Sequence, residues 1–313
     1  MGDSPVVAIV GAGLVGSGWA LVFARAGCEV RVYDPDEPTR SRLPAWIEAS
    51  AADLESNGLI ASAAEVIGRV RLCESLPEAL DGATYVQESV FETVESKTAA
   101  CLAIDKAMSP QTIVGSSSSG IPASQFTGNC RHRQNFLIAH PVNPPHLVPV
   151  VELVPAPWTD PSALEQVREL MNRVGQVPVH VRREIDGFVL NRLQGALLNE
   201  AWALYEEGYA SLADIDATIS HGLGLRWSFM GPFETIDLNA PGGIADYAAR
   251  LAPLYYRMAT QRVPRKWPQE TIEQAQAERR EVLAEEDLAE RRLWRDSVLS
   301  RLAAFKKTNG LGP

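Results

Sequence analysis

Hydrophobic positions follow two alternating patterns in the first part of the chain. Short apolar runs rich in β-branched residues predict buried strands at 6–10, 30–33, 70–73, 85–88, 113–115, 136–139 and 177–181. Stretches with helical spacing lie between them, at 17–26, 44–56, 61–67, 76–80, 93–108 and 161–174. Strands that alternate with helices favour parallel pairing through right-handed crossovers. We therefore expect an α/β fold with a doubly wound, Rossmann-type sheet.

The pattern changes near residue 186. From there the segments have helical spacing and no clear strand pattern returns. One apolar stripe is formed by Leu190, Leu193, Leu197, Leu198, Ala201 and Leu204. The last 44 residues carry 8 basic and 9 acidic side chains, a mixture that favours solvated amphipathic helices over a basic arm. We expect a Rossmann domain at 1–185 and an all-helical C-terminal domain at 186–313.

A glycine-rich turn joins the first expected strand to the first expected helix. Its residues are Gly11, Gly13, Leu14, Val15 and Gly16, in the order GxGxxG. The first glycine permits a tight turn, the second lets the backbone approach a pyrophosphate, and the third lets helix and strand pack closely. Free N–H groups at the helix start then hold the phosphates. This context predicts a dinucleotide site.

The acid at the end of the second strand selects the dinucleotide. Asp34 lies 18 residues after Gly16, where a carboxylate accepts hydrogen bonds from ribose hydroxyls and repels a 2′-phosphate. We therefore expect NAD rather than NADP. A tight corner without a cofactor, or a flavin or nucleotide-sugar site, is the alternative interpretation of the same glycines.

Composition narrows the partners. The 313 residues are 46% hydrophobic and 22% charged with a net charge of −10, which is typical of a soluble globular protein. This charge repels nucleic acid and anionic lipid, and no run of about 18 apolar residues could span a bilayer. The opening residues carry no basic leader. We expect a small-molecule partner, no nucleic acid and no membrane.

The cysteines indicate the compartment. Cys28, Cys73, Cys101 and Cys130 show neither the paired spacing of a zinc site nor that of a redox dithiol. They are typical of buried thiols in a reducing cytoplasm. We expect a cytoplasmic protein without a metal site.

The segment from Phe136 to Pro155 contains candidate acid–base residues. Two apolar stretches flank a loop rich in Pro, and in a hairpin centred near His146 they place His140 and Glu152 opposite each other. An imidazole beside a carboxylate is a general-base pair. A structural histidine and an edge glutamate are the alternative. The other histidines, His132, His146, His180 and His221, lack an acidic partner at an interpretable spacing.

Two further polar segments are candidates for substrate binding. Ser116 to Ser119 follow an expected strand, at the edge where doubly wound sheets bind ligands. One of these hydroxyls could hold a substrate oxygen, or the serines could form a capping turn. Asn191 opens the helical region and could contribute to the same crevice or cap a helix.

Several motifs together resemble the 3-hydroxyacyl-CoA dehydrogenase superfamily over nearly the whole chain: GAGLVGSGWA with Asp34, SSSSG, HPVNPP followed by VVELVP, and DGFVLNRLQ. The segments EEGYAS, GLGLRWSFMGPFET with LNAPG, and RRLWRDSVLSRLAAFK are most similar to its λ-crystallin or L-gulonate 3-dehydrogenase branch. The resemblance implies an NAD-binding N-terminal domain and a helical C-terminal domain that forms a homodimer.

The resemblance also implies roles for single residues. It makes His140 the base and Glu152 its partner, and it assigns the reacting oxygen to Ser119 and Asn191. It matches three further residues to positions near the nicotinamide side of NAD: Glu92, Lys97 and Asn143. An exposed ion pair at a helix start is the alternative interpretation of Glu92 and Lys97.

One departure from the acyl-CoA enzymes concerns the substrate. Those enzymes carry lysines after the second strand, where CoA docks. In this chain the corresponding stretch, 45–68, contains no Lys or Arg, and its charged residues are the acids Glu48, Asp53, Glu55 and Glu65. Arg226 offers a fork for a free carboxylate, or it forms a surface or interdomain salt bridge.

We therefore expect NAD-dependent oxidation of the C3 hydroxyl of a small 3-hydroxycarboxylate, with L-gulonate giving 3-dehydro-L-gulonate. The alternatives are an L-carnitine dehydrogenase, whose cation could contact Trp227 and Phe229, a short-chain 3-hydroxyacyl-CoA dehydrogenase, and a non-catalytic, crystallin-like NAD-binding protein.

Overall fold

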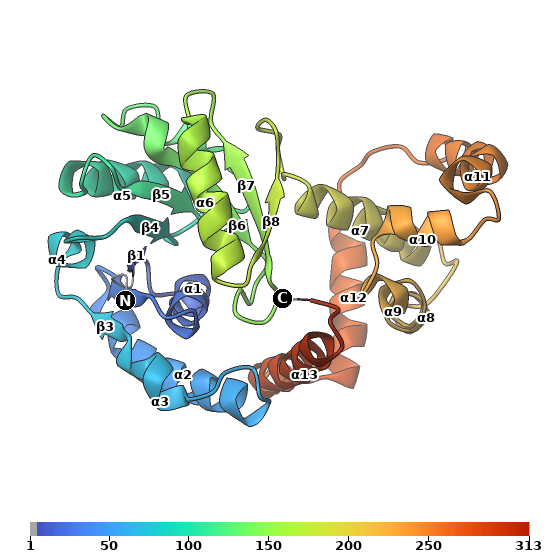
Figure 1. The fold of residues 1–313 in the computed structure, drawn as a ribbon. Helices are drawn as coiled ribbons and strands as arrows, with labels where there is room; N and C mark the ends of the chain where they lie inside the picture. The colour runs from blue at the N-terminus through green and yellow to red at the C-terminus, as the bar shows by residue number, and fades with distance from the viewer. Residues whose placement is uncertain (1–4, 313) are drawn as a thin grey trace. The chain divides into compact units, whose positions relative to one another are not determined.

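A computed structural model describes residues 5–312 of the chain. Eight strands form one sheet in the order β3-β2-β1-β4-β5-β6-β7-β8 (Figure 1). Their bounds are β1 Val6–Val10, β2 Glu29–Tyr33, β3 Val70–Leu72, β4 Tyr85–Glu88, β5 Ile113–Ser116, β6 Phe136–Pro141, β7 Val150–Pro155 and β8 Val177–His180. The first six strands are mutually parallel, while β7 is antiparallel to β6 and parallel to β8. The predicted doubly wound sheet is confirmed.

Six helices connect these strands: α1 Leu14–Arg25, α2 Glu37–Ser56, α3 Ala63–Gly68, α4 Leu76–Leu80, α5 Val94–Ala107 and α6 Pro161–Arg173. Helix α2 begins earlier than the expected start at Pro44. Its N-cap is Asp36, whose carboxylate accepts a hydrogen bond from the Thr39 backbone N–H at 3.0 Å, and Pro44 lies inside the helix. The Asp36 cap and Pro38 in the first turn together set the helix start.

Helices follow β8 as expected. They are α7 Leu190–Glu206, α8 Leu212–Thr218, α9 Gly224–Trp227, α10 Pro232–Leu238, α11 Gly243–Thr260, α12 Gln269–Val282 and α13 Leu288–Thr308, with a single π-helical turn at Ile219–Leu223. Among residues 5–312, none of these helices combines the length and the apolar character that crossing a bilayer requires.

The chain forms two compact units. The first comprises residues up to 193 together with the C-terminal segment from 290, and the second comprises 194–289. This division differs from the expected helical domain at 186–313, because the end of the chain returns to the first unit.

Alternation along the strands gives the first unit a core on each face of its sheet. Val7 and Ile9 of β1 pack with α1, α2 and α6 on one face. Ala8 and Val10 pack with α4 and α5 on the other face. Successive side chains of a strand point to opposite faces, so both faces of this sheet are covered by helices, as parallel sheets require.

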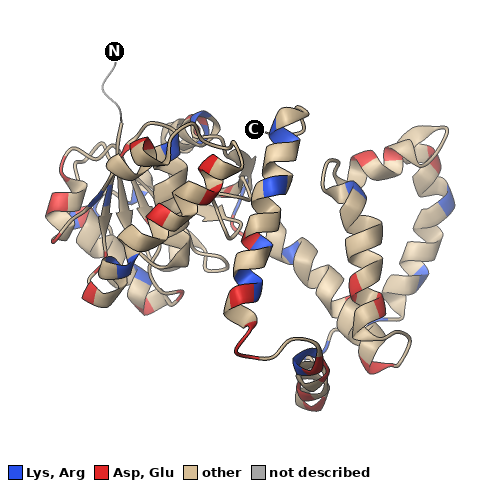
Figure 2. Cartoon of the chain, turned by 90° about the horizontal axis from the view of Figure 1, so that it is seen from below, with Lys and Arg blue, Asp and Glu red and all other residues tan. Residues whose placement is uncertain are grey.

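Helix α13 packs on α2 within the first unit. Buried Ser300 donates a hydrogen bond to the Asp53 carboxylate, and Leu299 packs against the core. The Lys307 ammonium donates to the Leu59 carbonyl at 3.2 Å. The charged side chains of α13 are mostly basic (Figure 2), since six Lys and Arg accompany only Glu290 and Asp296. The segment is a helix, as expected, and it packs on α2, although its own charge is basic.

The second unit is held by ion pairs and aromatic contacts between helix α7 and the segment after α11. Arg262 bonds the carboxylates of Glu200 at 2.7 Å and Glu207 at 2.8 Å. The Trp202 and Trp267 rings stack with centroids 5.2 Å apart. These contacts are partly exposed, so each contributes modestly to stability.

Candidate active site

The glycine turn between β1 and α1 has the shape of a phosphate cradle. Gly11 has a φ of +102°, and a Cβ at this position would lie 2.5 Å from the Ser89 carbonyl oxygen. A Cβ at Gly16 would lie 1.8 Å from the Gly11 carbonyl oxygen, whereas the space beside Gly13 is open. Gly13 caps α1 without a side chain, so the first N–H groups of the helix are free for phosphate oxygens. These residues fit a dinucleotide.

Asp34 lies beside this turn, at the carboxyl end of β2. One carboxylate oxygen accepts from the Ala12 N–H at 2.7 Å and the other from the Asp36 N–H at 2.9 Å. Each oxygen keeps a second lone pair. The half-buried carboxylate is therefore fixed next to the cradle and can still accept hydrogen bonds from ribose hydroxyls.

The predicted hairpin of His140 and Glu152 is confirmed. The two residues are direct partners in the antiparallel ladder of β6 and β7. His140 Nδ1 lies 2.8 Å from Glu152 Oε2, and both side chains are buried. Spacing predicted this pair because the register of a hairpin is symmetric about its turn.

Glu152 also binds the start of α7. Its Oε1 accepts hydrogen bonds from the Val189 and Leu190 N–H groups at 2.8 and 2.9 Å. Burial raises the pKa of Glu152, but the hydrogen bonds from His140 and from these two N–H groups outweigh burial and hold the pKa below its usual value. The carboxylate therefore stays charged beside the imidazole.

The joint before α7 is strained and packs on the imidazole. Phe188 is fully buried with a φ of +48°, and it follows Gly187 at +73°. Its ring centroid lies 5.8 Å from that of His140. A non-glycine residue in the left-handed region costs free energy, which burial of the phenyl ring offsets. The joint fixes one face of the imidazole.

The serine turn after β5 and Asn191 are brought together. Asn191 Nδ2 donates to the Ser119 carbonyl oxygen at 2.6 Å. Ser118 is buried and donates its hydroxyl hydrogen to Glu92 Oε1 or the Ile121 carbonyl, both at 2.8 Å, whereas Ser119 is exposed. Of these two serines, Ser119 is therefore the one that can reach a ligand.

Glu92 and Lys97 form a charge cluster with Glu88. Lys97 and Glu88 are buried, so the interpretation as an exposed pair is wrong for Lys97, whereas the Glu92 side chain is 39% exposed. The side chain of Lys97 is 1% exposed, and its Nζ lies 3.2 Å from carboxylate oxygens of both Glu88 and Glu92. Glu92 also accepts from the Ser119 N–H at 2.7 Å. Burial raises the pKa of Glu92, but Lys97 and hydrogen bonds from the serine turn hold it below its usual value. The cluster fixes the serine turn to α5.

Two predicted residues lie outside these clusters. Asn143 is exposed in the loop after β6, three residues beyond His140 in the sequence. Arg226 is exposed in α9 of the second unit, and it makes no ion pair with any residue in the described range 5–312. Both side chains are available to a ligand.

One histidine pair was missed by sequence spacing. His132 has no acidic partner at an interpretable spacing, but its Nδ1 lies 3.0 Å from Oδ1 of Asp105, which is 27 residues away in the sequence. Asp105 also accepts the N–H groups of Arg131 and His132. These residues precede β6, so the pair lies at the amino edge of the parallel strands and not in the candidate site.

The arrangement at the carboxyl edge can accept a proton from an alcohol. Because His140 Nδ1 faces Glu152, the imidazole donates from Nδ1 and leaves the lone pair of Nε2 free. The Ser119 hydroxyl donates to Glu92 Oε1 at 3.2 Å, and Asn191 Nδ2 keeps one N–H besides the one that it donates to Ser119. A base, oxygen-binding groups and a dinucleotide cradle at one edge of a sheet are the parts that hydride transfer from an alcohol requires.

Family models match both parts of the chain. Residues 6–185 match the 3-hydroxyacyl-CoA dehydrogenase NAD-binding domain, and residues 187–282 match the C-terminal domain of the same enzymes. These matched ranges meet next to the boundary expected from the hydrophobic pattern.

Similar proteins point to the same group. λ-Crystallin from Oryctolagus cuniculus is 40% identical over 309 residues, which cover 96% of each chain. L-Carnitine dehydrogenase from Pseudomonas putida is 34% identical over 79% of this chain and 76% of its own. Among solved structures, 5-formyl-3-hydroxy-2-methylpyridine 4-carboxylic acid 5-dehydrogenase, an NAD⁺-dependent dismutase, matches with a TM-score of 0.73 and 28% identity over 92% of this chain and 99% of that one. The chain is therefore a member of the NAD-binding 3-hydroxyacyl-CoA dehydrogenase family.

Proposed function

We propose that the chain oxidises the C3 hydroxyl of a small 3-hydroxycarboxylate with NAD, and that L-gulonate is this substrate, giving 3-dehydro-L-gulonate. The identity of 40% to λ-crystallin along nearly the whole chain supports this branch of the family. The buried His140–Glu152 pair supports catalysis, which argues against a crystallin-like protein without activity.

The residues of the first unit divide the chemistry between them. His140 takes the hydroxyl proton at Nε2, and Glu152 stabilises the imidazolium that forms. Ser119 and Asn191 hold the oxygen while its negative charge develops. NAD, when bound, supplies the acceptor for the hydride from C3. The glycine turn and Asp34 hold its phosphates and its adenosine ribose.

The main support for a small substrate without CoA is the surface of α2 and α3, which α13 covers. Residues 45–68 contain no Lys or Arg, and Ser300 of α13 bonds Asp53 in the middle of this stretch. Lys307 of α13 bonds the Leu59 carbonyl. A surface that is already covered by a helix disfavours docking of CoA there. It favours a small acid without a nucleotide carrier.

L-Carnitine is the second candidate substrate. The chain is 34% identical to the L-carnitine dehydrogenase of Pseudomonas putida. Trp227 and Phe229 are exposed beside Arg226. Aromatic faces attract a quaternary ammonium, and a guanidinium binds a carboxylate. Carnitine carries both groups.

We also propose that the protein forms a homodimer in the cytoplasm. The second unit exposes large apolar side chains on several helices, among them Phe233, Leu238 and Tyr256. Apolar surface of this extent favours a second copy as its cover. The four cysteines are free thiols, which is typical of a reducing compartment.

The test is formation of NADH from NAD⁺ with L-gulonate, L-carnitine, 3-hydroxybutyrate and 3-hydroxybutyryl-CoA in turn. We expect L-gulonate to give the highest kcat/KM, and the CoA thioester to be slower by about two orders of magnitude. Highest activity with L-carnitine supports the second candidate. Preference for the thioester, or no NADH with any of the four, contradicts the proposal.

Arg226→Met is the variant that tests carboxylate recognition. Loss of a charge-assisted hydrogen bond of about 1.5 to 3 kcal/mol should raise KM for L-gulonate by about 10- to 100-fold. Arg250→Met, in the same unit, removes an exposed arginine that already pairs with Asp246 and should leave KM unchanged. An unchanged KM in Arg226→Met would remove this residue from the site.

A further inference from the structure

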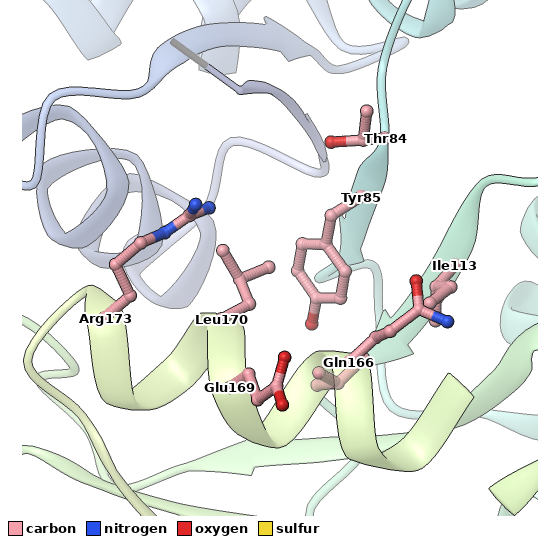
Figure 3. A pocket seen from close by; sticks show the side chains of 8 residues that line it. Thr84, Tyr85, Ile113, Gln166, Glu169, Leu170 and Arg173 are labelled. Atoms are coloured by element: carbon pink, nitrogen blue, oxygen red, sulfur yellow. The ribbon is translucent and has the colours of Figure 1, made fainter. Parts of the chain in front are cut away.

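A row of polar side chains crosses the sheet along β4. Tyr85, Gln87 and Ser89 occupy alternate positions and therefore share one face. Tyr85 lies in the wall of a surface pocket of about 340 Å³ between α6 and the starts of β4 and β5 (Figure 3). Gln87 is completely buried, and Ser89 is half-buried just after the strand. The row thus runs from the amino edge of the sheet to its carboxyl edge.

The neighbours of Gln87 fix the direction of its hydrogen bonds. Its Nε2 lies 3.1 Å from the Ala139 carbonyl oxygen and 2.8 Å from Ser117 Oγ. Because a carbonyl oxygen only accepts, the amide nitrogen must face it, and Gln87 donates to Ser117. The Tyr85 hydroxyl donates to Gln87 Oε1 at 2.6 Å. A Cβ at Gly115 would lie 2.0 Å from this hydroxyl, so the absence of a side chain at Gly115 leaves space for the Tyr85 hydroxyl.

The row of hydrogen bonds from Tyr85 through Gln87 ends in two serine hydroxyls, and one of their two O–H hydrogens has no acceptor. Ser117 Oγ and Ser89 Oγ lie 2.8 Å apart, and one of them donates to the other. Ser117 cannot donate to Gln87, which already donates to it. Neither hydroxyl has a further hydrogen-bond partner within the described residues. One O–H of the pair is therefore left without an acceptor in the protein.

This pair lies beside the phosphate cradle. The Ser89 N–H donates to the Val10 carbonyl at 2.7 Å, and the Ser89 carbonyl oxygen closes the space next to Gly11. Strand β4 lies on the opposite side of β1 from β2, which carries Asp34. Since Asp34 marks the adenosine ribose, the serine pair lies on the nicotinamide side of the cradle.

We propose that the Ser89–Ser117 hydroxyl pair donates a hydrogen bond to bound NAD, to a phosphate or ribose oxygen beyond its AMP half. The spare O–H can donate to a phosphate or ribose oxygen of the ligand, and both serines are partly accessible. Gln87 keeps the pair oriented outward, since it consumes an acceptor position of Ser117 and leaves the hydroxyl hydrogens for other partners.

Binding measured without a hydroxy acid tests this proposal, so the result does not depend on the substrate proposed above. Ser89→Ala, Ser117→Ala and the double variant are compared with the parent by calorimetry with NAD⁺, ADP-ribose and AMP. The double variant should raise Kd for NAD⁺ and ADP-ribose about 5- to 10-fold and leave Kd for AMP within about twofold. The single variants should lose less, because the remaining hydroxyl can turn to the ligand.

Ser109→Ala is the matched control. Its hydroxyl bonds Gln111 at 2.7 Å in the exposed loop before β5, so all three Kd values should stay at those of the parent. The ligand-free Tm of Ser89→Ala and Ser109→Ala should change little, whereas Ser117→Ala and the double variant leave a buried Gln87 N–H without its acceptor and should have a lower Tm. A double variant that binds NAD⁺ within twofold of the parent overturns the proposal, as does an equal loss for AMP, which would indicate a distorted glycine turn. If the double variant does not fold, Kd values unchanged in both single variants overturn it.

Discussion

The two units of the chain bury their side chains to different extents. The first unit encloses large residues such as Trp19, Phe23 and Leu137 on the two faces of its sheet. In the second unit, 194–289, the buried residues are only Ala203, Thr235, Ala240 and Ala275. The first unit thus contains the core that a domain needs for independent stability. The second unit contains many large apolar side chains, but most of them are exposed and do not form a buried core.

The same contrast applies to polar groups. The ionisable pairs of the first unit include buried ones, such as Lys97 with Glu88. The pairs of the second unit, such as Arg262 with Glu200, are partly exposed. A buried pair loses much when one partner is removed, whereas an exposed pair contributes little. Precise positioning is therefore concentrated in the first unit.

Removal of the base should have the largest effect. In His140→Ala, kcat should fall by about 10³- to 10⁴-fold, because no other group of the site can take the hydroxyl proton. Kd for NAD⁺ should stay within about twofold, since His140 does not belong to the cradle. Steady-state kinetics and calorimetry measure the two. His180→Ala, an exposed histidine at the end of β8, serves as the control. A loss of kcat below tenfold would remove His140 from its role.

A matched pair of phenylalanines tests the contrast in burial. Phe23 is fully buried and Phe233 is 74% exposed. Phe23→Ala should lower the free energy of unfolding by about 3 to 5 kcal/mol, and Phe233→Ala by less than about 1 kcal/mol in dilute protein. Urea unfolding at two protein concentrations measures both. If a second copy covers Phe233, its variant should lose stability only at the higher concentration. Equal losses for both variants in dilute protein would contradict the contrast.

Acid should destabilise the first unit through His146. Burial, and then the charge of Arg25, lowers the pKa of His146 from 6.5 to about 4. Below pH 6.5 His146 is protonated in the unfolded chain but stays neutral in the folded chain. The free energy of unfolding is therefore highest above this pH and decreases as the pH falls. Between pH 6.5 and about pH 5 the loss should be about 2 kcal/mol. Urea unfolding across this range should show a smaller slope in His146→Phe; an unchanged slope would assign the loss to other groups.

Local patterns in the sequence predicted much of the first unit. The strands, the glycine turn and Asp34 follow from short motifs, and the hairpin brings His140 and Glu152 together because both lie near one turn. Residues joined across crossovers could not be found in this way. Asp105 meets His132 and Asp53 meets Ser300 only after distant elements pack. No spacing along the chain encodes such contacts.

The start of α2 and the extent of the helical region show two other limits. Helix α2 begins at the Asp36 cap with Pro38 in its first turn, and Pro44 lies inside the helix. The mixed charges near the end of the chain predicted an amphipathic helix but not the surface that it covers. Periodicity identifies an apolar face, whereas its partner depends on the packing of the whole chain.

The return of α13 to the first unit has a consequence for biosynthesis. Ser300 and Leu299 complete the surface around α2, yet they leave the ribosome after the whole of 194–289. During synthesis, the surface of α2 in the N-terminal unit therefore stays uncovered until translation is nearly finished. Ribosome-bound chains that end before 290 should be more sensitive to protease at α2 than the released protein.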